Sequence, residues 1–591
     1  MKGFLKTVLA VIVGGIILGL VTFSFSIAAL IGIAASAETR QPVEKGSVLR
    51  ISLNGTLQEQ YEEDPLASLT GDVANESMGL DQLLSAIYEA KKNDKIKGIY
   101  LEGGSLETTP AMAQELRQAL KSFKDGKKFI YAHADQYSGL AYYVCSVADE
   151  LTVNPIGGVD WHGLASTPMF FKDVMDKLGV KAQVFKVGTY KSAVEPYTST
   201  QMSEANREQV TAFLGSIWNQ MLTEVSQSRK VDAETLNAVA DSFPMLHPTR
   251  KSQEWKLVDG LAYTDQAKAK LQKLLKLKKD EKIKFVSPKD LVAAITPSTE
   301  KNQVAVYYAW GDIVTEPAQN LLTGGAGHSI VGGTVANDLR KLREDENVKA
   351  VVLRVNSGGG SVFASEEIWR EMVLLRKAKP VVVSMGGMAA SGGYYISAPA
   401  NKIYAEPTTL TGSIGVFGII PDASKLLTEK IGLKFDLVKT NRHADFGSMG
   451  RAMNESEQAL MQRNVEETYT QFIRRVVDGR KLPEAKVRQI AEGRVWTGEQ
   501  AKQLGLVDQL GSLQDAVKDA AKLAKIKKYS TAGYPKALPW YMEMLNKEKE
   551  GYMESKLRQV MGENYEAVSA LSVLNSQDRI QARIPFLPNI R

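Results

Sequence analysis

The sequence of 591 residues contains a single cysteine, Cys145, and only five histidines. One cysteine excludes an intramolecular disulfide, a zinc ribbon and a cysteine-ligated cluster. The histidines are dispersed along the chain, at His133, His162, His247, His328 and His443. None belongs to an H-E-x-x-H pair, so no metal site built on histidines is expected.

The chain also lacks a strong charge of either sign. Lysine and arginine number 73 against 67 acidic residues, a formal charge of +6 that gives no reason to expect a nucleic-acid partner. With 44% hydrophobic and 24% charged residues, the chain can bury ordinary cores and is not of the disordered class. At about 150 residues per domain, its length corresponds to about four domain-sized units or two larger ones.

One long uncharged segment lies at the N-terminus. Lys2 and Lys6 precede it, and no charged residue follows until Glu38. A bilayer core needs about 20 apolar residues, so we expect a cytoplasmic stub at 1–7 and a transmembrane anchor at 8–35. Basic residues on the N-terminal side place the rest of the chain outside the cytoplasm, on the outer side of the inner membrane in a bacterial cell.

A cleaved signal peptide is the alternative for this segment, because Ala35-Ser36-Ala37 resembles a cleavage site. The apolar region of a signal peptide runs only about 7–15 residues, which favours a retained anchor. A linker at 36–46 then leads into the remainder of the chain.

The remainder is predicted to be a tandem duplication. Residues 95–105 (KIKGIYLEGGS) match 347–357 (NVKAVVLRVNS) at a spacing of 252, and the same spacing superimposes Tyr142-Tyr143 on Tyr394-Tyr395. Residues 176–186 find their match 253 positions later, and LVDGL at 257–261 finds LVDQL 249 positions later. Order and spacing are preserved, so one fold unit is written twice.

Each copy alternates strand-like and helix-like segments, which predicts an α/β structure with a mostly parallel sheet. The first repeat is expected at 47–300 and the second at 301–530. The tail at 531–591 is rich in charge and is expected to be helical, as a docking or oligomerisation element.

The two copies differ where chemistry is expected. In the second copy a buried strand runs into NSGGGS at 356–361, where glycines let backbone N–H groups approach a bound group; a simple turn is the alternative. Farther on, Ser391 in MAASGGYY lies at a strand-to-helix turn, where a serine can attack a carbonyl or merely cap the helix. The first copy has Gly139 opposite Ser391, with Ser138 one position away.

A nucleophilic serine requires a base, and two candidates are present. His443 is one. The other is Lys191 in GTYKSAVEPY, which would have to be held neutral by burial, with its pKa lowered from about 10.4 towards 7–8. Lys191 lies opposite Ala444 or His443, so the second copy lacks this lysine while the first copy lacks the serine.

The segments NSGGGS, MAASGGYYISAPA, TLTGSIGVFG and GTYKSAVEPY, in a duplicated chain behind one anchor, resemble the long, tandem-repeat members of the signal peptide peptidase A family. The resemblance covers residues 47–530. It implies a serine protease with a Ser/Lys dyad on a crotonase-like or Clp-protease-like fold. It also implies a homotetramer, with sites where first and second copies meet.

Carried over residue by residue, the resemblance makes Ser391 the nucleophile and Lys191 the general base. Gly359 and Gly360 become oxyanion-hole donors, and Ser413 a hydroxyl that orients the lysine. Where the family has a proline in the glycine loop, this chain has Gly358, which should loosen the loop. Such a dyad needs no metal or cofactor.

The substrates implied are peptides, namely remnant signal peptides in or near the membrane. Two other functions are possible from the sequence. A crotonase-type acyl-CoA enzyme would use the same pair of backbone donors, although CoA is cytoplasmic. A non-catalytic membrane scaffold would be expected to have lost both the serine and the lysine.

Overall fold

The computed structural model describes residues 14–15, 42–61, 78–278, 280–296, 298–316, 328–448, 450–536 and 580–583. The stub and the anchor predicted at 1–7 and 8–35 lie outside these residues, apart from Gly14 and Gly15. Among the helices of the described ranges, none has both the length and the apolar character that a membrane crossing requires.

The first repeat is built on a seven-stranded parallel sheet with the order β2-β1-β3-β4-β5-β7. Strand β8 also pairs with β1, near the start of that strand, at Val48 and Leu49. Its strands are β1 (Ser47–Gln58), β2 (Met78–Gly79), β3 (Ile96–Glu107), β4 (Phe129–Tyr137), β5 (Glu150–Val159), β7 (Gly260–Leu261) and β8 (Phe285–Val286). Helices cover it, among them α3 (Leu80–Lys92), α4 (Pro110–Lys124), α5 (Gly139–Cys145), α8 (Glu204–Arg229), α9 (Ala233–Asp241), α11 (Thr264–Leu274) and α12 (Pro288–Ala293).

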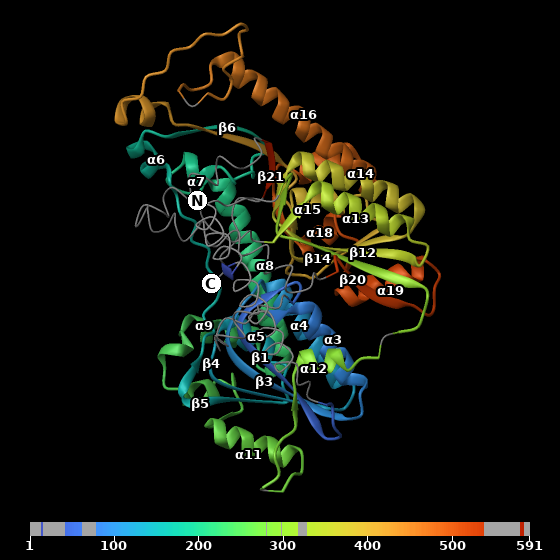
Figure 1. The fold of residues 1–591 in the computed structure, drawn as a ribbon. Helices are drawn as coiled ribbons and strands as arrows, with labels where there is room; N and C mark the ends of the chain where they lie inside the picture. The colour runs from blue at the N-terminus through green and yellow to red at the C-terminus, as the bar shows by residue number, and fades with distance from the viewer. Residues whose placement is uncertain are drawn as a thin grey trace, which may run out of the picture.

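The second repeat has an eight-stranded sheet with the order β18-β16-β14-β12-β9-β20, and β15 joins β14 to β19. Its strands are β9 (Gln303–Trp310), β12 (Val348–Ser357), β14 (Val381–Ala390), β15 (Lys402–Ala405), β16 (Leu410–Gly412), β18 (Val495–Thr497), β19 (Gln509–Leu510) and β20 (Ser530–Tyr534). Its helices include α13 (Gly332–Glu344), α14 (Val362–Ala378), α15 (Gly392–Ser397), α16 (Glu455–Arg480), α18 (Gly498–Leu504) and α19 (Leu513–Leu523). Figure 1 shows the two repeats as two α/β bodies, the first in blue to green and the second in yellow to orange.

Equivalent contacts confirm the duplication in three dimensions. The hydroxyl of Tyr142 donates to the carbonyl of Leu257 at 3.0 Å, and that of Tyr394 donates to the carbonyl of Leu506 at 2.9 Å. Helices α8 and α16 both have 26 residues, and both end at a lysine in the left-handed conformation. The α/β prediction and the tandem repeat are therefore both correct.

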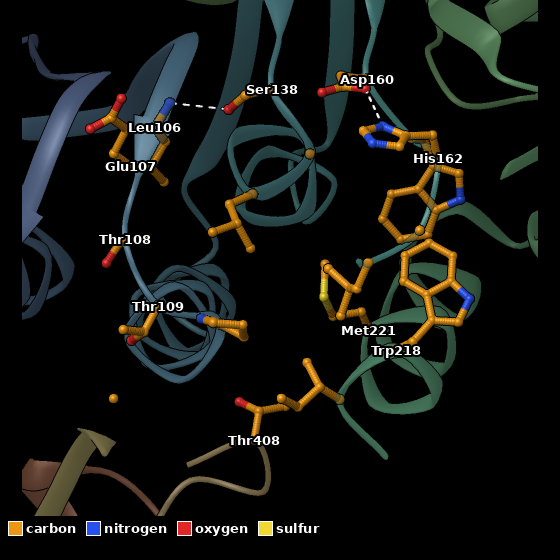
Figure 2. Close-up of a pocket in the computed structure, with 18 of the residues that line it drawn as sticks. Leu106, Glu107, Thr108, Thr109, Ser138, Asp160, His162, Trp218, Met221 and Thr408 are labelled. Atoms are coloured by element: carbon orange, nitrogen blue, oxygen red, sulfur yellow. Dashed lines mark hydrogen bonds and ion pairs between the residues drawn. The ribbon is translucent and has the colours of Figure 1, made fainter. Parts of the chain in front are cut away.

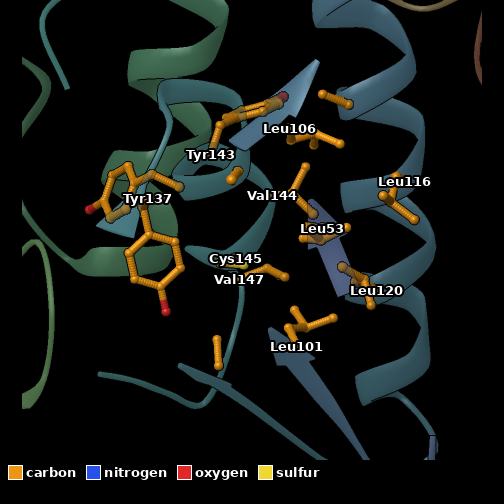
Figure 3. Packing of buried hydrophobic residues seen from close by; sticks show 14 of the residues in the cluster. Leu53, Leu101, Leu106, Leu116, Leu120, Tyr137, Tyr143, Val144, Cys145 and Val147 are labelled. Atoms are coloured by element: carbon orange, nitrogen blue, oxygen red, sulfur yellow. The ribbon is translucent and has the colours of Figure 1, made fainter. Parts of the chain in front are cut away.

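The core of the first repeat surrounds Cys145, the only thiol in the chain. Figure 3 shows Cys145 and Val144 packed between Leu101, Leu120 and the ring of Tyr137. Burial raises the pKa of the Cys145 thiol, which keeps it in the protonated form. Cys145 is thus a small core residue, as expected from its apolar neighbours.

A third sheet joins the repeats, with the order β11-β10-β13-β21-β17-β6. Its strands are β6 (Lys181–Val187), β10 (Asp312–Val314), β11 (Ser329–Val331), β13 (Gly359–Ser361), β17 (Val416–Asp422) and β21 (Ile580–Arg583). Strand β6 belongs to the first repeat and pairs antiparallel with β17 of the second, so that Val187 faces Val416 and Lys181 faces Asp422. This pairing carries the chain that follows β6 into the second repeat.

A buried ion cluster also connects the repeats. Arg354 on β12 donates to Glu59 at 2.8 Å and to Glu115 on α4 at 2.7 Å, and all three side chains are almost completely buried. The free carboxylate oxygen of Glu115 accepts from the backbone N–H of Leu513 at 2.7 Å. Such a cluster is costly to break, because removal of one partner leaves an uncompensated buried charge.

The tail predicted to be helical at 531–591 is described only at 531–536 and 580–583. Most of the segment expected to be helical lies outside the described residues, and the residues described on either side of it form strands: Ser530–Tyr534 is β20 and Ile580–Arg583 is β21. Strand β21 lies between β13 and β17, far in sequence from both. Its conformation is set by these two neighbours and not by local propensity.

Candidate active site

Ser391 lies at the end of β14, a strand whose residues are all buried, and directly precedes helix α15. Its backbone has φ 55° and ψ −113°, a conformation that L-residues rarely adopt and that costs about 1–3 kcal/mol. The strained backbone is held by two hydrogen bonds: the Ser391 N–H donates to Gly412 and its carbonyl accepts from Tyr395, both at 2.8 Å. A sharp strand-to-helix turn of this kind is typical of nucleophilic serines.

Lys191 comes from the first repeat, in the turn after β6. Because β6 pairs with β17, this turn lies against the second repeat, and Nζ of Lys191 lies 2.8 Å from Oγ of Ser391. The structure therefore brings together the serine and the lysine that the sequence singled out from different copies. Both side chains are completely buried.

Burial lowers the pKa of the Lys191 amine well below its ordinary value of 10.5. The other described partners of Nζ are the hydroxyl and the carbonyl of Ser413, at 3.1 and 3.2 Å, and neither is charged. Since no carboxylate of the described residues stabilises the ammonium form, Lys191 is neutral far below the pH at which an exposed lysine loses its proton.

Ser413 is placed as the resemblance implied, next to Lys191. Its φ is 46°, and its N–H donates to the carbonyl of Arg494 at 2.7 Å, which fixes the turn after β16. The hydroxyl and carbonyl of Ser413 together direct Nζ of Lys191 at Ser391.

The glycine loop lies on the other side of Ser391. Gly359 and Gly360 have φ of 103° and 155°, a region open to glycine and strained for other residues. The N–H of Gly359 donates to Oγ of Ser357 at 3.1 Å, so one predicted oxyanion donor already has a partner.

Sequence reasoning missed Gly392, whose backbone nitrogen lies close to the glycine loop. A Cβ added to Gly359 would lie 2.7 Å from the nitrogen of Gly392, so these two backbones nearly touch. Gly392 directly follows the serine. The residue after the nucleophile is a common oxyanion donor at such turns, and this position would have been the signal.

Strand β21 fills the groove between the glycine loop and β17. Gly359 pairs with Arg583, Gly360 with Ala582, and on the other side Phe417 pairs with Gln581. The carbonyl oxygen of Ala582 lies 2.0 Å from where a Cβ on Gly359 would be and 3.1 Å from the corresponding point on Gly392. Part of the chain's own tail thus lies in extended conformation beside Ser391.

His443, the other candidate base, lies elsewhere. Its Nδ1 is 3.6 Å from the carboxylate of Glu457, at the start of α16, and none of its described contacts involves Ser391. No cluster of three or more metal-ligating side chains occurs in the described parts of the chain.

Comparison with known proteins places this arrangement in a family. The sequence matches peptidase family S49 over residues 122–278 and 374–527, once in each repeat, and Clp protease over 321–410. The Clp match supports the fold expected for the second repeat.

Three relatives extend this comparison. "Protease 4" of Salmonella typhi is 40% identical over 488 residues, which cover 81% of this chain and 77% of that protein. "Serine protease SPPA, chloroplastic" of Arabidopsis thaliana is 30% identical over 495 residues, 82% of this chain and 70% of that protein. "Putative signal peptide peptidase SppA" of Enterococcus faecium is 40% identical over 189 residues, 32% of this chain and 55% of that protein. The chain therefore belongs to peptidase family S49, as a serine peptidase in which the family unit is repeated in tandem.

Proposed function

We propose that the chain hydrolyses peptides with Ser391 as nucleophile and Lys191 as general base. The observation that carries the proposal is the distance of 2.8 Å between Nζ and Oγ in a fully buried setting without a carboxylate. A neutral amine at hydrogen-bond distance from a serine hydroxyl is the arrangement that a Ser/Lys mechanism requires.

The reaction runs in two halves. Neutral Lys191 takes the hydroxyl proton as Oγ of Ser391 bonds to the peptide carbonyl carbon. The oxyanion accepts from backbone N–H groups of Gly392 and the Gly359–Gly360 loop, where the Gly359 N–H exchanges its Ser357 partner for the oxyanion. The C–N bond then breaks, and the departing amine takes the proton from Lys191, which leaves an acyl-enzyme. Water gives a proton to Lys191 and attacks the ester, and Ser391 recovers its proton as the carboxylic product departs.

Substrates bind as an extended strand between β13 and β17. Strand β21 supports this mode, because it occupies that groove with Ala582 beside the glycine loop and with its side chain buried. Main-chain pairing gives affinity without sequence preference, and the buried position next to Ser391 favours a small residue. We infer that remnant signal peptides are the substrates, in line with the name of the Enterococcus faecium relative.

The membrane anchor at 8–35 remains part of this proposal. An anchored enzyme with its repeats outside the cytoplasm meets apolar peptides where they are left after export.

A homotetramer is also proposed, from an unpaired counterpart of β6. Residues 434–440 match β6 at a spacing of 253, yet they form no strand in the described part of the chain, and Phe435 and Val438 are 53% and 96% exposed. The first-repeat counterpart of β17 is 164–170, which is also unpaired. Pairing of 434–440 with 164–170 of the next copy would repeat the β6–β17 contact between copies and build a ring, and the family resemblance implies that the ring has four copies.

Hydrolysis of an apolar fluorogenic peptide by the full chain in detergent tests the dyad. Ser391→Ala and Lys191→Ala should each abolish turnover while the protein stays folded. Lys186→Ala removes an exposed lysine from β6, and Ser397→Ala removes a buried hydroxyl from α15; both should remain active. Turnover by Lys191→Ala would show that the base lies elsewhere.

A further inference from the structure

A cavity lies between the first repeat and the edge of the second, apart from the Ser391–Lys191 dyad. It is a cavity of about 780 Å³ whose walls come from both repeats. Figure 2 shows Trp218 and Met221 on one side, Thr108 and Thr109 on the other, and Thr408 of the second repeat below. Cavities of this size accommodate peptide-sized or drug-sized ligands.

This cavity is the first repeat's counterpart of the peptide groove beside Ser391. Helices α4 and α14 begin 252 positions apart, at Pro110 and Val362, and in both the preceding residue caps the helix with its hydroxyl. The same spacing places Glu107 and Thr108 where the second repeat has Gly359 and Gly360. In the second repeat this groove holds strand β21, an extended peptide.

The catalytic features are absent from the cavity. Ser138 precedes α5 as Ser391 precedes α15, but its φ of −65° and ψ of 160° are ordinary. Its hydroxyl accepts a hydrogen bond from the N–H of Leu106 at 3.0 Å, which holds it against β3. Thr108 stands where the second repeat has Gly360 of the glycine loop. The candidate base of the first repeat, Lys191, lies beside Ser391 and not in this cavity.

The cavity nevertheless keeps the chemistry of a binding site. Its apolar wall includes Trp218, whose ring centroid lies 4.6 Å from that of the buried Trp161. Two carboxylates, Glu107 and Asp160, border it, and among the described residues that line it there is no lysine or arginine. His162 is hydrogen-bonded to Asp160 at 2.5 Å, and Glu107, whose carboxylate accepts from the Thr56 hydroxyl at 3.5 Å, is exposed to solvent.

We propose that this cavity is a second, non-catalytic peptide-binding site, which takes an extended apolar segment next to a lysine or arginine. It rests on the proposed function, because its ligand is the same class of peptide that Ser391 cleaves. The apolar segment packs on Trp218 and Met221, and the cationic side chain lies at one of the two acids, Glu107 or Asp160, which stand on opposite sides of the cavity (Figure 2). Bound there, a long substrate is held near the enzyme while another part of it enters the catalytic groove.

Photo-crosslinking to full-length Ser391→Ala protein tests this site. The probe is a short apolar peptide with p-benzoylphenylalanine at its centre and lysines at one end, and labelled residues are mapped by mass spectrometry. We expect label on Met221 or Met388, which line the cavity, as well as in the catalytic groove. A second probe with glutamates in place of the lysines should lose the cavity label and keep the other.

Variants then assign the contacts. The pair Glu107→Gln and Asp160→Asn should reduce cavity labelling by the lysine probe about tenfold, and Trp218→Ala should reduce it by a similar factor. Glu455→Gln, a change to an exposed acid on α16, is the matched control and should leave the labelling unchanged.

Absence of label from the cavity, or label that is indifferent to the charges of probe and protein, would overturn the second site. Hydrolysis by the wild-type chain and label in the catalytic groove report on the proposed function separately. A protein that is active but shows no cavity label therefore loses only this inference, and an inactive one loses the proposed function.

Discussion

Nζ of Lys191 lies 2.8 Å from Oγ of Ser391, although 200 positions separate the two residues in the chain. Each comes from a different repeat, and the contact depends on the pairing of β6 with β17. Neither repeat alone can assemble the dyad. The proposed mechanism therefore makes activity depend on the correct docking of the two repeats.

The pH dependence of turnover should report on Lys191. Burial lowers its pKa, and only the neutral amine can take the serine proton, so kcat/KM should rise as pH increases through that lowered pKa. Lys191→Arg keeps a cation of similar length that stays protonated, and should be inactive at every pH. A kcat/KM profile between pH 5 and 10 checks this; an active arginine variant would contradict it.

The same burial gives stability a definite pH dependence. Between the lowered pKa and 10.5, the unfolded chain binds the Lys191 proton and the folded chain does not, so this group makes stability rise with pH across that window. Lys191→Met should remove that part of the slope. Urea unfolding at pH 7 and pH 9 measures it, and an unchanged slope would mean that Lys191 is protonated in the folded protein.

Gly359→Ala should abolish most activity. The added Cβ would lie 2.0 Å from the carbonyl oxygen of Ala582, in the space where a substrate strand runs, so it would obstruct the proposed peptide groove. Gly46→Ala is the matched control, because Gly46 has φ of 90° and open space around it. If both variants lose activity equally, backbone strain and not the groove is responsible.

Arg354→Met should destabilise the protein by about 3–5 kcal/mol, since it leaves Glu59 and Glu115 buried without their cation. The exposed pair of Arg50 and Glu102 provides the comparison, and Arg50→Met should cost at most about 1 kcal/mol. Urea unfolding midpoints of the two variants measure how much stability the buried cluster and the exposed pair each contribute. Equal effects would show that burial of the cluster does not govern its contribution.

Glu406→Gln should flatten the dependence of stability on pH. Burial raises the pKa of Glu406 well above 4.5, so the folded chain binds its proton more tightly than the unfolded chain. The contribution of this tighter proton binding to the free energy of unfolding is fully present below pH 4.5 and is lost as pH rises through the raised pKa of Glu406. Thermal unfolding from pH 5 to 9 measures the slope, with Glu234→Gln, an exposed acid, as control.

Removal of the tail from residue 580 onward should lower KM for peptide substrates, because β21 occupies the groove that they enter. Ala582→Trp should act in the same direction, since the Ala582 side chain is 1% exposed and the indole has no room there. Steady-state kinetics of both variants provide the measurement. A KM that does not fall would show that the tail does not compete with substrate.

The sequence was sufficient for the fold class, the duplication and the proximity of Ser391 and Lys191. Repeated segments preserve spacing, and the complementary loss of one residue from each copy indicates a shared site. The role of Gly392 as an oxyanion donor could also have been predicted from the sequence, because it directly follows the serine.

Other features could not be predicted from local sequence. Four residues, Ile580–Arg583, carry too little pattern to indicate a strand, and their partners β13 and β17 lie far away in the chain. Arg354 stands in the apolar run AVVLRV, and only the structure shows that two acids of the other repeat meet it. Both features depend on contacts between distant segments.

Because the two residues of the dyad come from different repeats, the dyad also determines when during synthesis the chain can begin to cleave other proteins. During synthesis Lys191 emerges long before Ser391, and the partners of its Nζ, Ser391 and Ser413, both belong to the second repeat. Cleavage begins only when the second sheet has formed and accepted β6. A partly synthesised or truncated molecule therefore lacks the complete dyad, and only the fully folded chain can cleave peptides.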